Sequence, residues 1–284
     1  MLDGVKDGVK TALRQWTLKL AGPDFERRVM ALPQQQNEYG VDPFGFDPDF
    51  MTMAIGPFLW LYRNYFRVQT FGIEKVPSGR VLLVSNHSGQ IPLDAAMIAI
   101  AMLVEAEPPR AVRSMVEKWV QTLPYVSTFM ARAGQIVGTP ENCRRLLEAE
   151  EAILVFPEGV RGLGKLWPQR YQLQEFGLGF LRLALETRSP VVPVAVIGAE
   201  EQAPGLMNLK PLADWLRMPY LNITPTGLPV PLPAKYRIYF GDPLYFHGQA
   251  DDEDAELDKK VAAVKNTLQE MIHRGLAERK HVFR

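Results

Sequence analysis

Residues 81–94 constrain the fold most strongly, because an apolar run there stops abruptly at a polar cluster. Pro92 then opens a second apolar segment that is rich in Ala, Met and Ile. This order predicts a buried strand, a tight loop and a helix start. The loop carries His87, one of only four histidines, and Asp94 follows it by seven residues. A histidine beside a carboxylate at a strand-to-helix turn suits general-base chemistry.

From residue 67 onward, strand-like and helical pieces alternate along the chain. The predicted strands are 67–73, 81–85, 111–114, 134–137, 152–156, 191–197 and 235–240. The predicted helices are 92–104, 116–130, 141–150, 175–187, 205–217 and 252–277. Such alternation predicts an α/β fold with a mixed, largely parallel central sheet that is flanked by helices on both faces.

The region before the alternation predicts a separate N-terminal helical and aromatic segment, 1–64, ahead of the main domain, 65–284. Residues 1–20 place apolar side chains at helical spacing among basic ones, so this helix either lies in a lipid interface or packs on its own domain. Residues 33–50 read as a loop or strap. Residues 51–66 are rich in aromatic side chains and read as a buried or interfacial helix, with lipid contact left open.

Composition narrows the function classes. Lysine plus arginine equals aspartate plus glutamate at 32 each, which argues against nucleic acid as a partner. The single cysteine, Cys143, excludes an intrachain disulfide and suits a reducing compartment. There is no apolar run of about 18 residues that could span a bilayer, and no secretory signal. We therefore expect a cytoplasmic protein that binds peripherally to the cytoplasmic face of a membrane.

His87 and Asp94 could act as a base and its orienting carboxylate. If the helix starts at Pro92, Asp94 lies near its third position and can accept a hydrogen bond from one ring nitrogen. That bond would fix the tautomer and leave the other nitrogen free. Asn86 and Ser88 are small polar neighbours that leave room to bind a substrate. The alternative is that His87 only caps the turn while Asp94 serves the helix dipole.

Two further strand ends carry candidate binding residues. The run 152–156 enters a Pro/Gly turn, and ligands of open α/β sheets bind beyond the carboxyl ends of the strands. Arg161 could hold a phosphate or carboxylate, and Glu158 could accept from a substrate hydroxyl; alternatively the two form a surface ion pair of little energetic weight. Pro193, inside the run 191–197, cannot donate to a strand ladder, which predicts an edge, a bulge or a pocket wall.

In this order the motifs resemble those of the glycerolipid (lysophospholipid) acyltransferase superfamily, over residues 65–245. The motifs are Asn-His-Ser-Gly…Asp at 86–94, Phe-Pro-Glu-Gly-Val-Arg-Gly at 156–162 and Val-Val-Pro-Val at 191–194. The chain looks closest to the monoacylglycerol and diacylglycerol acyltransferase branch. The resemblance implies a glycerolipid acyltransferase-like fold. It also implies transfer of a fatty acyl group from acyl-CoA or acyl-carrier protein to a hydroxyl of a lysophospholipid, glyceride or related lipid alcohol.

The resemblance also implies roles for individual residues. His87 would be the general base and Asp94 its orienting carboxylate, with no bound cofactor and no metal. The residues expected to bind substrate are Asn86, Ser88, Glu158, Gly159, Arg161 and Pro193. Because a thioester is already activated, we expect no acyl-enzyme, and backbone N–H groups at the start of helix 92–104 are the expected oxyanion donors. Cys143 is expected to be a structural thiol.

The sequence departs from the family pattern in two places. Six residues separate His87 from Asp94, where the family motif has four. The segment 133–139, which corresponds to the family's phosphate-contacting segment, contains no arginine. The nearest arginines that could substitute are Arg132, Arg144 and Arg145. A neutral glyceride or other lipid alcohol therefore gains over lysophosphatidate as the acceptor.

Other functions remain as alternatives. A lipid esterase or thioesterase would need a nucleophile elbow, and the chain has no Gly-x-Ser-x-Gly. A non-catalytic peripheral lipid-binding protein would use 1–20 and 51–66. A nucleotide-binding enzyme is disfavoured because the Gly-x-Gly pairs lack the third glycine of a dinucleotide fingerprint. A zinc site is disfavoured because His247, His273 and His281 show no ligand-pair spacing.

Overall fold

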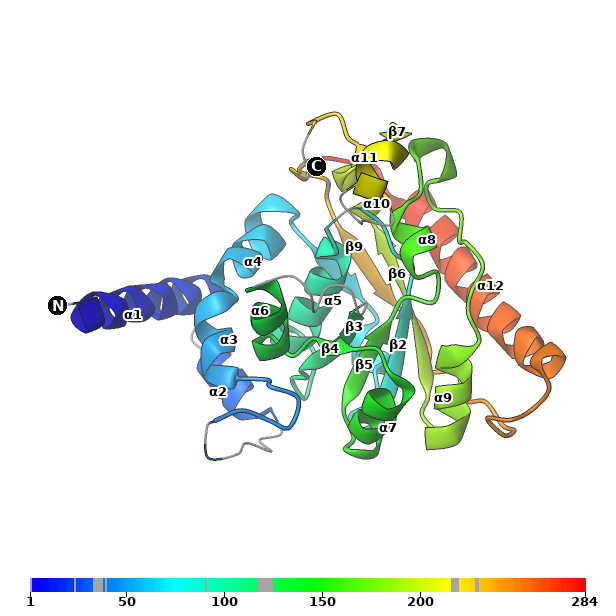
Figure 1. The fold of residues 1–284 in the computed structure, drawn as a ribbon, viewed down its shortest axis with the longest axis horizontal. Coiled ribbons are helices and arrows are strands. Elements are labelled where there is room, and N and C mark those ends of the chain that lie inside the picture. The colour runs from blue at the N-terminus through cyan, green and yellow to red at the C-terminus, as the bar shows by residue number, and fades with distance from the viewer. Residues whose placement is uncertain are drawn as a thin grey trace.

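A seven-stranded sheet forms the centre of the computed structural model (Figure 1). The structure describes residues 2–22, 24–32, 38, 40–89, 91–116, 125–215, 220–227 and 230–284. The strands of this sheet are β1 (Gln69–Phe71), β2 (Val81–Ser85), β3 (Val112–Val116), β4 (Ile136–Val137), β5 (Ala152–Val155), β6 (Val191–Ile197) and β9 (Arg237–Phe240). Their order is β1-β9-β6-β2-β5-β3-β4, and only the β6–β9 pair is antiparallel. The predicted mixed, largely parallel sheet is confirmed.

Helices cover both faces of the sheet. The helices are α1 (Leu2–Ala21), α2 (Phe25–Met30), α3 (Pro48–Ala54), α4 (Gly56–Trp60), α5 (Leu93–Val104), α6 (Val126–Arg132), α7 (Pro140–Glu148), α8 (Val160–Leu163), α9 (Gly179–Thr187), α10 (Ala199–Gln202), α11 (Lys210–Trp215) and α12 (Asp254–Glu278). The short strands β7 (Met207–Asn208) and β8 (Asn222–Ile223) form a separate pair beside α11. Figure 1 shows α1 projecting from the body on the side opposite α12.

Strand β2 shows why the central run is continuously apolar. Val81 and Leu83 face the core under α5, whereas Leu82 and Val84 face the core under α7, α9 and α12. All four side chains are fully buried. A strand buried on both faces needs apolar residues at every position, which is why this run was recognisable in the sequence.

The predicted single helix 51–66 is instead three pieces. Helix α3 ends at Ala54, α4 runs to Trp60, and a π-helical turn, Leu61–Tyr65, follows. Pro57 lies in the first turn of α4 and has no N–H to continue the ladder from α3. The Met53 carbonyl instead accepts a hydrogen bond from the Thr17 hydroxyl at 3.5 Å. The break therefore provides a contact that anchors α1.

Two other helix predictions differ from the structure at their ends. The prediction 116–130 begins inside β3 and crosses residues 117–124, which lie outside the described residues; α6 begins only at Val126. The prediction 205–217 is replaced by β7 and the shorter α11. In both cases apolar residues at helical spacing belong partly to strands, because short apolar runs do not distinguish the two.

The prediction that Pro193 marks an edge is wrong. Strand β6 lies between β2 and β9 in the sheet interior. Pro193 is tolerated there because the β6–β9 register shifts beside it. Val194 pairs with Phe240, whereas Val191 bridges Leu244, so one extra residue lies on the β9 side, as the predicted bulge requires. The Gly241 N–H still donates to the Pro193 carbonyl at 2.8 Å. Only the donor that proline lacks is missing from the ladder.

The N-terminal segment shares a core with the sheet. Phe25, Leu59 and Tyr62 are buried in the same apolar cluster as α5. Arg63 donates to the Leu20 and Ala21 carbonyls at the end of α1, where a cation is favoured by the helix dipole. Within the described parts of the chain, the longest apolar helices are too short or too polar to cross a bilayer. The boundary between 1–64 and 65–284 stays a prediction.

A stability prediction follows from the two-sided burial of the sheet. Leu154 in β5 is 0% exposed, so Leu154→Ala should lower the free energy of unfolding by about 2–5 kcal/mol through lost burial and a residual cavity. Leu206→Ala removes the same atoms from a side chain that is 57% exposed and should change stability by less than about 0.5 kcal/mol. Urea unfolding monitored by circular dichroism measures both. Equal losses would contradict the assignment of β5 to the core.

Candidate active site

The three strand ends singled out in the sequence lie side by side. Strand β2 pairs with β5 on one side and β6 on the other, all parallel. The loops that follow these strands therefore meet at one edge of the sheet. His87 follows the central strand of the three, and Glu158 follows β5. The sequence prediction that these two residues converge is confirmed by the strand order.

Asp94 hydrogen-bonds the imidazole of His87. The distance from His87 Nδ1 to Asp94 Oδ2 is 2.7 Å. The His87 side chain is 9% exposed and the Asp94 side chain is fully buried. No other described residue forms a hydrogen bond with the ring, so the Nε2 position is left for a substrate. This geometry orients a histidine and leaves one ring nitrogen to exchange a proton.

The His87–Asp94 loop accommodates its two additional residues through a turn. Gly89 has φ of +82°, a conformation that favours glycine, and α5 begins at Leu93. The Asp94 carboxylate also accepts from the backbone N–H groups of Ser88 at 3.0 Å and Ala95 at 2.8 Å. Both oxygens are therefore held, and the longer spacing does not separate the carboxylate from the ring.

The ring of His87 also packs against the loop after β5. It stacks on Phe156 with ring centroids 3.8 Å apart and an interplanar angle of 18°. Gly162 lies against the same histidine: a Cβ added there would stand 3.1 Å from His87 Cβ and 3.0 Å from Glu158 Cβ. The close approach of the two loops therefore requires a glycine at position 162.

Glu158 lies beneath His87 as a buried backbone clamp. Its Oε1 accepts from the His87 N–H at 3.1 Å, and its Oε2 accepts from the Gln174 N–H at 2.8 Å. The side chain is 0% exposed. Both oxygens are thus engaged inside the protein, and the expected hydrogen bond from an acceptor hydroxyl stays a prediction. Glu158 and Arg161 do not pair with each other.

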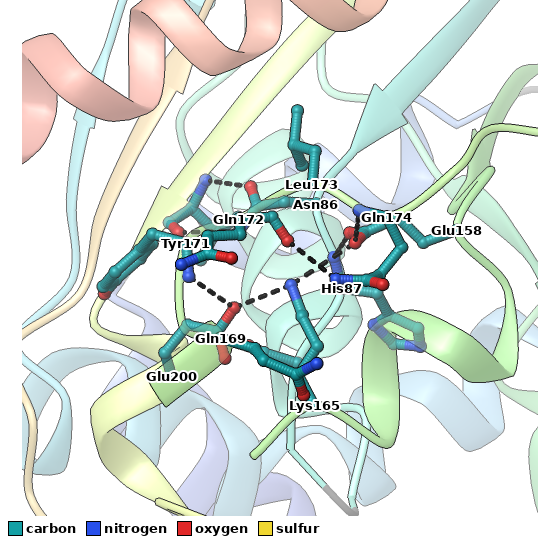
Figure 2. A network of polar contacts seen from close by, with 12 residues as sticks. Asn86, His87, Glu158, Lys165, Gln169, Tyr171, Gln172, Leu173, Gln174 and Glu200 are labelled. Carbon is teal, nitrogen blue, oxygen red and sulfur yellow. Dashed lines mark hydrogen bonds and ion pairs between the residues drawn. The ribbon is translucent and has the colours of Figure 1, made fainter. Parts of the chain in front are cut away.

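A buried lysine carries the counter-charge of this clamp. Figure 2 shows the Lys165 ammonium between two carboxylates, 3.4 Å from Glu158 Oε2 and 2.8 Å from Glu200 Oε1. Burial by itself lowers the pKa of Lys165, but Glu200 and Glu158 outweigh that effect and raise it. Glu200 also accepts from the Tyr171 N–H at 3.3 Å. The lysine is therefore held in its charged form.

Asn86, Ser88 and Gly159 surround the histidine in different ways. The Asn86 amide bonds the backbone of Val196 twice, donating at 3.0 Å and accepting at 2.8 Å, which ties the loop to β6. Ser88 is fully buried, and its hydroxyl has no partner among the described residues. Gly159 has φ of +57° and turns the chain from β5 into α8. Asn86 thus has a structural contact where substrate contact was expected.

Arg161 and Pro193 have contacts of their own, separate from the His87–Asp94 pair. Arg161 is 54% exposed and pairs with the exposed Glu175 at 3.0 Å. Such a pair contributes little to stability, so the guanidinium stays free to exchange partners. The Pro193 ring faces Met271 of α12 across Gly241, on the sheet face opposite α5. Its register partner in β2 is Val84, three residues before His87.

The arginines near 133–139 are occupied elsewhere. Arg132 binds Asp47 at 2.6 Å, and Arg144 binds Glu186 at 2.7 Å. Arg145 lies over the Phe44 ring. Strand β4 is also three places from β2 in the sheet, roughly 14 Å at the usual strand spacing. The structure therefore does not bring these arginines to His87 as substitutes for the family's arginine.

The expected oxyanion donors at the start of α5 are largely engaged. The Leu93 N–H donates to Ile91, the Ala95 N–H to the Asp94 carboxylate, and the Ala96 N–H to Pro92. Three N–H groups at this helix start are therefore engaged, and the role of the helix start as an oxyanion donor stays a prediction. Cys143 lies on the buried side of α7, and burial raises its pKa to about 11, consistent with a structural thiol. In the described part of the chain there is no cluster of His, Cys, Asp and Glu suited to a metal.

Sequence reasoning missed Lys165, Glu200 and the stacking of Phe156. Lys165 stands in Gly-Leu-Gly-Lys, where a lone lysine reads as a surface residue. Glu200 follows β6 in an acidic pair that reads as a solvated helix start. Only the burial of both side chains identifies them. The one usable signal was the position of Phe156, which directly follows β5 and opens the 156–162 motif.

The comparisons with known proteins agree with the site. A protein-family model described as Acyltransferase matches residues 67–197. An uncharacterized protein of Mycobacterium leprae is 40% identical over 259 residues, covering 87% of this chain and 70% of that protein. The chain belongs to the glycerolipid acyltransferase superfamily. It is an acyltransferase of lipid metabolism.

More distant relatives carry two kinds of name. A human "DGAT1/2-independent enzyme synthesizing storage lipids" is 25% identical, covering 72% of this chain and 60% of that protein. A probable 1-acyl-sn-glycerol-3-phosphate acyltransferase of Mycoplasma pneumoniae is 28% identical, covering 50% of this chain and 53% of that protein. The crystal structure of the Thermotoga maritima 1-acyl-sn-glycerophosphate acyltransferase PlsC has a TM-score of 0.55 and 14% identity, covering 96% of this chain and 98% of that one. That structure shows the fold; the branch within the superfamily stays a prediction.

The contact between the two loops gives a prediction with an internal control. Gly162→Ala should lower the unfolding free energy by about 1–3 kcal/mol and reduce acyltransferase turnover, because the added methyl displaces His87 or Glu158. Gly164→Ala, two residues away, meets its nearest atoms at 3.5 Å or more and should be tolerated. Thermal unfolding and turnover measured on both variants make the comparison. Equal tolerance of the two substitutions would contradict the close approach at position 162.

Proposed function

We propose that this protein transfers a fatty acyl group from an acyl thioester to a hydroxyl of a lysophospholipid, glyceride or related lipid alcohol, with His87 as the general base. The observation that carries the proposal is the 2.7 Å hydrogen bond from His87 Nδ1 to the buried Asp94 carboxylate, with Nε2 left for the acceptor. Membership of the acyltransferase family supports the reaction class. The choice of base and of substrates is our inference.

The proton transfers follow from the orientation of the ring. Asp94 holds Nδ1 protonated, so Nε2 is the basic nitrogen and can accept the proton of the acceptor hydroxyl. The oxygen then attacks the thioester carbonyl and forms a tetrahedral intermediate. As this intermediate collapses, the C–S bond breaks and the imidazolium returns its proton to the leaving thiolate. The buried carboxylate stabilises the imidazolium in between.

A thioester needs no further activation, which is why a single oriented base suffices. Binding the two substrates beside each other and removing one proton provide the main rate terms. The donor is acyl-CoA or acyl-carrier protein, which share the same thioester chemistry. No covalent acyl-enzyme is required, and Cys143, held protonated by burial, is not positioned by sequence or structure as a nucleophile.

The acceptor is the less determined substrate. Ser88 is placed to contact the acceptor hydroxyl, because its own buried hydroxyl has no partner among the described residues and it adjoins His87. Arg161 is exposed in a weak surface pair and could exchange Glu175 for a phosphate. The other arginines considered are held by Asp47, Glu186 and Phe44. This distribution favours a neutral acceptor such as a glyceride over lysophosphatidate.

Contact with a lipid surface is the second part of the proposal. Val9, Leu13 and Trp16 of α1 are 54%, 41% and 40% exposed, at spacings that place them on one helical face. Thr17 on another face is buried against α3 and α4. The helix therefore both packs on its own domain and offers an apolar stripe to lipid. In 51–66 the rings of Tyr62 and Phe66 are buried and those of Phe58 and Tyr65 are partly buried, and Trp60, 42% exposed, is the residue proposed to reach the interface.

The base assignment predicts a specific loss of activity. His87→Ala should reduce kcat for acyl transfer by about 10²- to 10⁴-fold, because the acceptor hydroxyl loses its proton acceptor. Asp94→Asn should also lose activity, because the amide no longer holds the correct tautomer. The measurement is transfer of a labelled acyl group from acyl-CoA to a panel of lysolipids and glycerides.

His247→Ala is the matched control, since His247 is exposed in a loop beyond β9 and should leave turnover unchanged. Near-normal turnover in His87→Ala would contradict the mechanism. Release of free fatty acid that does not respond to added acceptor would instead indicate a lipid esterase or thioesterase. Vesicle binding without turnover of any acyl donor would indicate a non-catalytic lipid-binding protein.

The lipid-contact proposal has its own test. The double variant Leu13→Glu, Trp16→Glu should weaken sedimentation with anionic phospholipid vesicles by about tenfold or more, because two apolar side chains lose their burial in the interface. Tyr245→Glu changes a side chain that is 68% exposed on the other part of the molecule and should bind as the wild type does. Unchanged binding of the double variant would show that α1 does not face the membrane.

A further inference from the structure

The buried charges beneath His87 form a structure of their own, distinct from the His87–Asp94 pair. Lys165 lies between Glu158 and Glu200, and the three side chains are at most 7% exposed. Lys165 comes from the segment after α8, Glu158 from the turn after β5, and Glu200 from α10 after β6. The three charges therefore join the loops that follow β5 and β6 to the loop that follows β2, which carries His87.

We propose that Lys165 is a positioning residue for acyl transfer: it keeps Glu158 in the form that holds the His87 main chain, and so fixes the base. The inference rests on the proposed function, since it assumes that His87 is that base. Lys165 does not touch the imidazole. It acts through Glu158, whose two oxygens receive the N–H groups of His87 at 3.1 Å and Gln174 at 2.8 Å.

The argument depends on which form of Glu158 can accept two N–H donors. An ionised carboxylate accepts at both oxygens, whereas a protonated one carries an O–H donor and has one oxygen less available. Glu158 is fully buried, and Glu200 is a second buried carboxylate on the same lysine. Without the ammonium, burial and the like charge would both favour protonation of one carboxylate. Lys165 is the group that opposes this.

Lys165 and Glu200 also link the histidine loop to a second buried cluster. Glu200 accepts from the Tyr171 N–H, and Figure 2 shows this chain of contacts running from Tyr171 to Glu158. The Tyr171 hydroxyl donates to Glu201, which Arg279 binds at 2.6 Å. The charged and titratable groups around the lysine, taken over every neighbouring element, are His87, Asp94, Glu158, Tyr171, Glu200, Glu201, Tyr220, Tyr236 and Arg279.

The experiment compares pH profiles of kcat between about pH 6 and about pH 9. In Lys165→Met, kcat should fall by about tenfold or more at the acidic end and recover as the pH rises, because the buried carboxylate pair then lacks the cation that favours its charged form. KM for both substrates should change little, since the lysine does not contact them. Lys259→Met, which removes a lysine from a surface pair with Glu256, should match the wild type throughout.

Two further variants show whether the lysine acts through Glu158. Glu158→Gln should lose activity at every pH, because the amide cannot accept at both positions. Adding Lys165→Met to Glu158→Gln should then cost little more. Adding Glu200→Gln to Lys165→Met should restore part of the acid-side activity, because one of the two unpaired carboxylates is removed. These outcomes separate positioning from a general loss of packing.

The proposal is overturned if folded Lys165→Met keeps the wild-type kcat and pH profile, or if Lys165→Met costs as much activity on top of Glu158→Gln as it does alone. If Lys165→Met fails to fold, the double variant Lys165→Met/Glu200→Gln is compared with the single variant Glu200→Gln. Identical pH profiles of kcat in these two variants would equally overturn the proposal. Histidine-labelled NMR spectra, with the His87 signal identified from His87→Ala, follow the ring without turnover. A pH-dependent change of that signal in Lys165→Met that the wild type does not show supports the coupling even if the wild type transfers no acyl group, an outcome that would refute only the proposed function.

Discussion

The hydrogen bond from the His87 main chain to the Glu158 carboxylate is the contact on which the site depends. Parallel strands deliver their loops to one edge of a sheet, but they do not fix how those loops meet. Here the buried Glu158 carboxylate joins the loop after β2 to the turn after β5. Its second oxygen accepts a hydrogen bond from the Gln174 N–H. Glycine at 162 and the stacked Phe156 close the same gap from the side. His87 is thus positioned by its main chain as well as by Asp94.

Burial of this carboxylate explains why a lysine accompanies it. Taking charges out of water costs more than a single ion pair returns unless further hydrogen bonds satisfy them. Glu158 and Glu200 obtain three backbone N–H donors between them, from His87, Gln174 and Tyr171. Lys165 supplies the charge that the amides cannot. The His87 site is therefore supported by a second set of charges, Glu158, Lys165 and Glu200, that need not touch a substrate.

The parts of this arrangement that the sequence could predict are those fixed by local pattern. Strands 81–85 and 191–197 were recognisable because central strands of a sheet covered on both faces are apolar at every residue. His87 and Asp94 were recognisable because their motif adjoins such a strand. For Pro193 the sequence left an edge, a bulge or a pocket wall open, because the one-residue register shift between β6 and β9 is set by tertiary structure. Lys165 and Glu200 were missed for the same reason, since their burial depends on loops far apart in the sequence.

The same distinction bears on substrate choice. Family motifs name the side chains, but their partners decide what they can do. The Asn86 amide hydrogen-bonds the backbone of Val196, and the Glu158 carboxylate accepts from two backbone N–H groups. Both side chains therefore already have partners within the protein. Arg132 and Arg144 are held by their acidic partners Asp47 and Glu186. Of the described arginines considered for this role, only Arg161 is left for a phosphate, and a single exposed guanidinium discriminates weakly between a charged and an uncharged lipid headgroup.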